Sequence, residues 1–75
     1  EIILYPNPST GKVNISGLNP GARIQVFNPT GAVLNERIAG KTIETVSLDN
    51  QPSGIYIIMV TDTGKFIGNY KVIKR

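Results

Sequence analysis

Apolar and polar residues alternate along this chain in short runs, and clusters of turn-forming residues interrupt the runs at roughly ten-residue intervals. Proline presets φ at the first position of a turn, and glycine accepts the positive φ that often follows, so such clusters end strands. The five clusters are Asn7–Gly11, Asn19–Gly21, Asn28–Gly31, Pro52–Gly54 and Thr61–Gly64. Short strands at this regular spacing indicate a β-sandwich or a barrel.

The runs between the turns predict seven strands, and no window shows the 3.6-residue period of a helix. The predicted strands are Ile2–Tyr5, Lys12–Ser16, Ala22–Asn28, Ala32–Ile38, Ile43–Leu48, Ile55–Thr61 and Lys65–Lys74. Two or three strands could not bury an apolar sheet face alone, so a second layer is needed. The fold class is therefore all-β, a seven-stranded antiparallel sandwich formed by a single domain over residues 1–75.

Two of these strands carry specific expectations. Ile55–Thr61 is apolar on both faces, which predicts a central strand whose two faces are both covered. Alternation within Lys65–Lys74 places one set of residues toward the core (Phe66, Gly68, Tyr70 and Val72) and the other set outward (Ile67, Asn69, Lys71 and Ile73).

The charge of the chain is concentrated at its end. The formal net charge is +3, and the last twelve residues hold four basic side chains and no acidic one. A basic cluster raises nucleic acid as a partner. We do not expect one, because the few aromatic residues fall in strand patterns where core packing accounts for them, and no Gly-rich phosphate loop accompanies them.

The chain offers little chemistry. It contains no histidine and no cysteine, so the usual general base, the commonest metal ligand and the best nucleophile are missing. The acids are scattered singly: Glu1, Glu36, Glu44, Asp49 and Asp62. Asp49–Gln51 supplies one carboxylate, too few for Ca²⁺. We expect no enzyme, no metal site and no cofactor. No apolar run approaches 18 residues, so no direct membrane insertion is expected.

Three segments point to a family. Near the start, Tyr5–Gly11 is followed by the alternating Lys12–Ile15. In the middle lie the short strand pieces Ile24–Asn28 and Gly31–Leu34. Toward the end, Pro52–Gly54 leads into the apolar run to Val60, and the chain finishes on Lys71–Arg75. In this order and spacing they closely resemble the type A C-terminal sorting domain of the type IX (Por) secretion system. The matching positions are Pro6, Asn7, Pro8 and Gly11, then Gly54, Ile55 and Tyr56, then Lys71, Val72, Ile73 and Lys74.

The resemblance implies a fold and a role. Such domains are seven-stranded Ig-like sandwiches and form the last module of cargo proteins in bacteria of the Bacteroidetes type. The folded domain directs its upstream cargo from the periplasm through an outer-membrane translocon to the cell surface or the exterior, where a sortase-like peptidase typically removes it. The chain is accordingly expected to be a module of a longer protein, and its partners the type IX translocon and the peptidase.

Turn chemistry and packing explain the first two motifs without a partner. Pro6 and Pro8 lack donors and stop the first strand, and the side chain of Asn7 can bond its own backbone. We expect Gly11 to adopt a positive φ. Gly54 would let the loop enter the central strand beside Ile55, and the Tyr56 ring would be buried with its hydroxyl bonded.

The terminal strand has two interpretations. Lysines blunt an exposed apolar strand edge against aggregation, and Lys71 and Lys74 could do only that. Alternatively, a translocon component captures the strand edge through main-chain pairing and reads its basic groups. The expected contact residues are Lys71, Val72, Ile73, Lys74 and Arg75.

Two other functions stay open. An Ig-like accessory or adhesive module that binds glycan or protein would need an aromatic platform or a calcium cluster on one sheet. A cell-wall or self-association module is a third option, although pairing of the first or the last strand edge could also produce dimers artificially.

Overall fold

The computed structural model describes residues 1–75 and contains seven strands. They are β1 (Ile3–Tyr5), β2 (Lys12–Ser16), β3 (Arg23–Phe27), β4 (Val33–Ile38), β5 (Ile43–Ser47), β6 (Gly54–Asp62) and β7 (Lys65–Lys74). Each end of each strand lies within one residue of its predicted position. The prediction of seven antiparallel strands in two sheets is confirmed.

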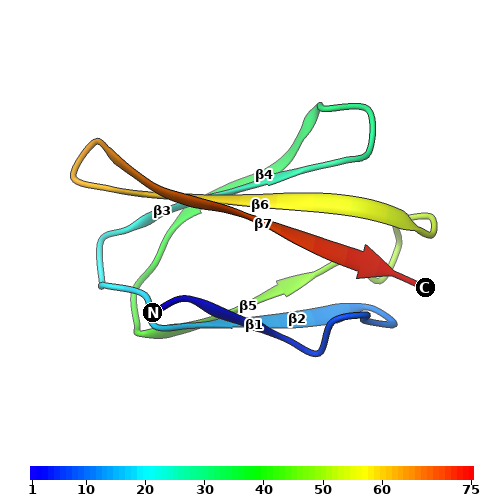
Figure 1. The fold of residues 1–75 in the computed structure, drawn as a ribbon, viewed down its shortest axis with the longest axis horizontal. Coiled ribbons are helices and arrows are strands. Elements are labelled where there is room, and N and C mark those ends of the chain that lie inside the picture. The colour runs from blue at the N-terminus through cyan, green and yellow to red at the C-terminus, as the bar shows by residue number, and fades with distance from the viewer.

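The strands form two layers (Figure 1). One sheet has three strands in the order β1-β2-β5, and the other has four in the order β4-β3-β6-β7. Strand β6 is central, as predicted, and β7 is an edge strand. The turn between them contains only Thr63 and Gly64, both with positive φ, which matches the right-handed twist of a two-residue hairpin.

The core lies between the two sheets and contains thirteen buried apolar residues. It follows from the period of two, since alternate residues of each strand face inward. Its strand members are Val13, Ile15, Ile24, Val26, Val46, Tyr56, Ile58, Val60 and Val72.

A bulge in β7 overturns one prediction. Val60 pairs with Gly68 but Thr61 pairs with Phe66, so Ile67 is an extra residue. An extra residue reverses the alternation beyond it. Phe66 therefore shares the outward face of Thr61 and is 61% exposed, so its predicted place in the core is wrong.

The second correction concerns β6. Its even-numbered residues from Tyr56 to Val60 face the core, whereas Ile55, Ile57 and Met59 face outward and no layer covers them. The expectation that both faces are covered is wrong, because the chain forms only two layers. The aromatic residues were also expected in the core, but Tyr56 alone is fully buried there and Tyr70 packs against it in part.

Candidate functional site

The first family motif and the last strand meet in space. Asn7 reaches β7, 64 residues away along the chain: its Nδ2 donates to the carbonyl oxygen of Lys71 at 2.8 Å. The backbone N–H of Ile73 donates to Asn7 Oδ1 at 3.0 Å. The amide of Asn7 thus bonds two backbone groups of β7 as a neighbouring strand would, rather than its own backbone as expected.

Ser9 continues this pairing. Its N–H donates to the Ile73 carbonyl at 2.8 Å, and its carbonyl accepts from the Arg75 N–H at 2.9 Å. These bonds form an isolated parallel bridge between Ser9 and Lys74. The edge of β7 between Lys71 and Arg75 is therefore occupied, and the open edge expected for main-chain capture is not available in this segment.

Ser9 is itself buried and fully bonded. It is 2% exposed, and its Oγ donates to the Lys12 carbonyl at 2.7 Å and accepts from the Gly11 N–H at 3.1 Å. The bonds of Ser9 to Lys12 and Gly11 anchor the loop that holds β7 to the start of β2. The prolines on either side of Asn7 both follow cis peptide bonds.

Position 11 requires glycine because there is no room for a side chain, and not because of its φ. The expected positive φ is wrong, since Gly11 is not among the glycines with that conformation. A Cβ at this position would collide with Asp49 Oδ1. Asp49 in turn pairs with Lys12 Nζ at 2.8 Å. Hydrogen bonds from the side chains of Lys12 and then Ser47 hold the pKa of Asp49 below its ordinary value.

The second motif anchors β6. The ring of Tyr56 is buried, and its hydroxyl donates to the Pro52 carbonyl at 2.6 Å. This bond four residues upstream has the form of the tyrosine corner of Ig-like sandwiches. A Cβ on Gly54 would meet Pro29 Cγ at 3.0 Å, so the loop after β3 packs closely against the start of β6. Ile55 is 48% exposed and points away from the core.

Ion pairing leaves the positive charge on β7. Three ion pairs use Lys12, Arg23 and Arg37 with Asp49, Glu36 and Glu44. Five basic side chains have no ion pair, and four of them lie on β7 or directly after it: Lys65, Lys71, Lys74 and Arg75, with Lys41 elsewhere. The +3 excess predicted to reside at the terminus therefore stays unneutralised there.

The five predicted contact residues do not share one environment. Val72 is 0% exposed and belongs to the core, so its side chain cannot reach a partner. Lys71, Ile73 and Arg75 are exposed, and Lys74 is half-buried near the Asp49 carboxylate. The terminal segment thus displays three to four side chains on a strand whose backbone is held by Asn7 and Ser9.

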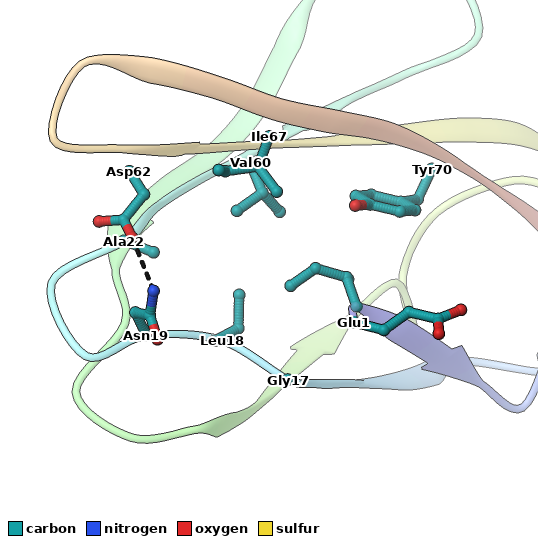
Figure 2. Close-up of a pocket in the computed structure, with 10 residues that line it drawn as sticks. Glu1, Gly17, Leu18, Asn19, Ala22, Val60, Asp62, Ile67 and Tyr70 are labelled. Atoms are coloured by element: carbon teal, nitrogen blue, oxygen red, sulfur yellow. Dashed lines mark hydrogen bonds between the residues drawn. The ribbon is translucent and has the colours of Figure 1, made fainter.

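A small pocket opens between the sheets near the start of the chain (Figure 2). Its volume is about 270 Å³. Leu18, Val60 and the bulged Ile67 give it apolar walls, and Asn19 Nδ2 donates to Asp62 Oδ2 at 2.9 Å at one end. No pattern in the sequence predicts this pocket, because the position of Ile67 in its wall depends on the bulge. No nucleophile in the pocket is paired with a base.

The structure brings no three acidic side chains together at a point where they could hold a metal ion. It has no helix with the length and apolar character needed to cross a bilayer.

The structure is a small β-sandwich whose basic last strand is held in place by the loop after β1. Residues 3–75 match the family described as the secretion system C-terminal sorting domain, and the chain belongs to this family. Domains of this Por secretion family are noncatalytic signals of the type IX secretion system that interact with its machinery and mark cargo for secretion or the cell surface. The chain is accordingly a sorting signal and not an enzyme.

A solved structure has the same fold. It is that of PorZ, an essential bacterial surface component of the type-IX secretion system of Porphyromonas gingivalis. The two chains superpose with a TM-score of 0.81 at 23% identity over 99% of this chain, which spans 11% of the PorZ chain. No curated protein matches the sequence.

Proposed function

We propose that this domain carries an upstream cargo protein from the periplasm through the type IX outer-membrane translocon to the cell surface or the exterior, where a sortase-like peptidase removes it. The observation that supports this role is the clamped terminal strand. Asn7 and Ser9 fix the backbone of Lys71–Arg75 on the folded sandwich, and the unpaired basic groups project from it.

Recognition then proceeds through side chains. The carbonyl of Lys71 and both backbone groups of Ile73 already have partners, so a translocon strand cannot pair with them without displacing Asn7 and Ser9. Lys71, Ile73, Lys74 and Arg75 are the contact residues of the proposal. Val72 contributes by anchoring the strand in the core.

Unpaired charge suits this task. Basic groups that have no internal partner keep their field for a second protein, and they speed encounter with an acidic surface. The folded sandwich also gives them fixed spacing, because a strand advances about 3.3 Å per residue and alternates its faces. An unfolded basic tail would offer the charge without the spacing.

The test uses a periplasmic reporter fused to the chain in a type IX-competent host. The intact fusion should reach the cell surface. Removal of Lys71–Arg75 should abolish export, but it also removes the core residue Val72. The triple variant Lys71→Ala/Lys74→Ala/Arg75→Ala keeps the core and should lower export by about tenfold or more, since lost charged contacts cost at least that much.

The matched control is Lys41→Ala/Lys65→Ala, which removes basic groups that also lack ion pairs but lie away from the terminus. It should export normally. Undiminished export of the triple variant would contradict the assigned contact residues, and an intact fusion left in the periplasm would contradict the sorting role. If the peptidase removes the domain, the reporter found at the cell surface should be shorter than its precursor by about the length of this domain.

A further inference from the structure

The outward face of the four-stranded sheet carries a continuous apolar surface. In the register of the sheet Phe27 lies opposite Ile57, and Ile55 lies opposite Ile73. Met59 follows in the next row, beside Gln25 and Asn69. We name this surface, made of Phe27, Ile55, Ile57, Met59 and Ile73, the outer patch. A shallow groove runs along most of it, toward the Pro29 loop.

No second layer packs on the outer patch, although three of its residues, Phe27, Ile57 and Met59, are half-buried. Ile55 and Ile73 are 48% and 43% exposed, and the second layer packs only on the other face of β6. The solvent-facing side of a strand favours β-branched residues, and threonine meets this preference without being apolar. Strand formation alone therefore does not explain isoleucine at these positions. Apolar surface gathered on one face of a small protein marks an interaction site.

The charges around the outer patch select its partner. Lys71 on β7 lies opposite Ile57, on the side away from Phe27, and it has no ion pair. The acid on this face, Glu36, already accepts bonds from Arg23 and Gln25. Arg75 adds a further exposed cation beyond Ile73. The border of the patch is therefore positive.

We propose that the outer patch, with Lys71 and Arg75 at its border, is the docking surface for a protein of the type IX translocon whose facing surface is apolar at its centre and carries carboxylates opposite these two cations. This assignment rests on the proposed function and extends the recognition site from the terminal strand across β6 to Phe27 on β3. Two copies of the domain do not fit face to face, because such a pairing would bring unpaired lysines of like sign together.

Apolar contacts and charges then have separate tasks. The centre of an interface supplies most of its affinity through desolvated apolar side chains, and the charged border sets orientation and rate. Ile57 lies at the centre and Lys71 at the border. The clamp by Asn7 matters here too, because it holds Lys71 and Ile73 in register with the rest of the patch.

The test pairs each change with the same kind of substitution elsewhere on the surface. Ile55→Thr/Ile57→Thr makes the patch polar while keeping β-branched residues. Its control, Ile3→Thr/Ile43→Thr, changes residues that are 54% and 48% exposed on the three-stranded sheet. Lys71→Glu reverses the border charge, and Lys65→Glu makes the same change at the hairpin end of β7. Lys71→Arg keeps the charge. Thermal unfolding of each purified domain establishes that it folds.

We expect Ile55→Thr/Ile57→Thr and Lys71→Glu to lower surface export of the reporter fusion by about tenfold or more, as for residues at the centre and border of an interface. The controls should stay within about twofold of the parent, and Lys71→Arg should export better than Lys71→Glu because it keeps the positive charge. A photo-crosslinking residue at position 57 should capture a translocon subunit during export, and one at position 45, on the opposite sheet, should not.

Several outcomes would overturn the assignment and leave the sorting role intact. Normal export of Ile55→Thr/Ile57→Thr is one, provided that the variant lacking Lys71–Arg75 stays in the periplasm. Equal crosslinking at positions 57 and 45 is another. A dimer in sedimentation that the double variant abolishes would assign the patch to self-association. Binding to phosphatidylglycerol vesicles that the double variant abolishes would assign it to a lipid surface. If the intact fusion itself is not exported, the proposed function fails as well.

Discussion

The outward faces of the two sheets differ in the side chains that they present to water at their centres. On the three-stranded sheet polar groups bond to one another: Thr45 Oγ1 donates to Asn14 Oδ1 at 2.8 Å, and Lys12 pairs with Asp49 at 2.8 Å. On the four-stranded sheet Ile55 and Ile57 occupy the corresponding central positions, and Lys71 beside them has no ion pair.

Both sheets are alike on the inside, where each contributes β-branched and aliphatic residues to one core. The difference is therefore not a requirement of the fold. At the centre of the three-stranded sheet the outward polar groups bond to one another, and its exposed Ile3 and Ile43 flank Ser16 at the end of β2. On the four-stranded sheet the apolar residues lie at the centre, and Lys71 beside them has no ion pair. This contrast separates what the domain needs in order to fold from what it offers to another protein, and substitutions on one strand can test it.

The sharpest test compares neighbours on β6. Ile58 is 0% exposed, so Ile58→Ala should lower the free energy of unfolding by about 2–5 kcal/mol through lost burial and a cavity. Ile57 faces outward, and Ile57→Ala should cost about 1 kcal/mol or less, mostly through β-propensity. Urea unfolding measures both. A single small core supplies only about 3–5 kcal/mol, so Ile58→Ala should come close to unfolding the domain.

If Ile57→Ala proves as costly as Ile58→Ala, the outer patch would be holding the fold together, and its apolar character would no longer indicate a partner.

The next comparison uses two asparagines. Asn7 bonds the backbone of Lys71 and Ile73, whereas Asn14 bonds only a threonine hydroxyl on the polar face. Asn7→Ala should cost about 1–3 kcal/mol, because it removes two hydrogen bonds to the backbone of β7, each worth about 0.5–1.5 kcal/mol. Asn14→Ala should cost about 1 kcal/mol or less, because water replaces the lost bond. The midpoint of urea unfolding at unchanged slope distinguishes them.

Hydrogen exchange locates the effect. In Asn7→Ala the Ile73 amide should exchange faster while the amides at the centre of β6 keep their protection. Protection of Ile73 equal to that of the parent would show that Asn7 does not hold the end of β7.

The strand count, the two sheets and the central place of β6 were all predictable, since each depends on local signals: turn residues, alternation and a doubly apolar run. The place of Phe66 was not, because a single bulge at Ile67 reverses the alternation and depends on tertiary pairing with Val60 and Thr61. The uncovered face of β6 was misjudged for a related reason. A run that is apolar on both faces indicates only that each face meets something apolar, and here one face meets no part of the domain.

The positions of the motif residues on their strands and loops were predictable, but their contacts were not. The turn chemistry around Asn7 suggested a local bond, yet its amide reaches β7, 64 residues away along the chain. Local propensity cannot distinguish those two outcomes. Alternation did place Val72 toward the core, and naming it a contact residue conflicted with that placement. Neither turn chemistry nor alternation could predict that Lys71 has no ion pair. That depends on which acidic residues pair with the other basic residues in the folded domain.

The smallest expected effect concerns the paired charges of the polar face. Hydrogen bonds from Lys12 and Ser47 lower the pKa of Asp49, so the unfolded chain binds a proton at higher pH than the folded one does. The stabilisation is complete above the ordinary pKa of about 3.9 and is lost as the pH falls through it toward the lower folded value. The melting temperature of the parent should therefore fall between about pH 5 and pH 2. Asp49→Asn should be less stable at pH 7, and its melting temperature should change less over this pH range. Lys71→Met on the apolar face should keep the pH dependence of the parent, because that lysine has no carboxylate partner to lose. An acid slope in Asp49→Asn as steep as the parent's would show that the polar face does not hold its charges together as described, and the contrast between the two faces would then depend on their apolar residues alone.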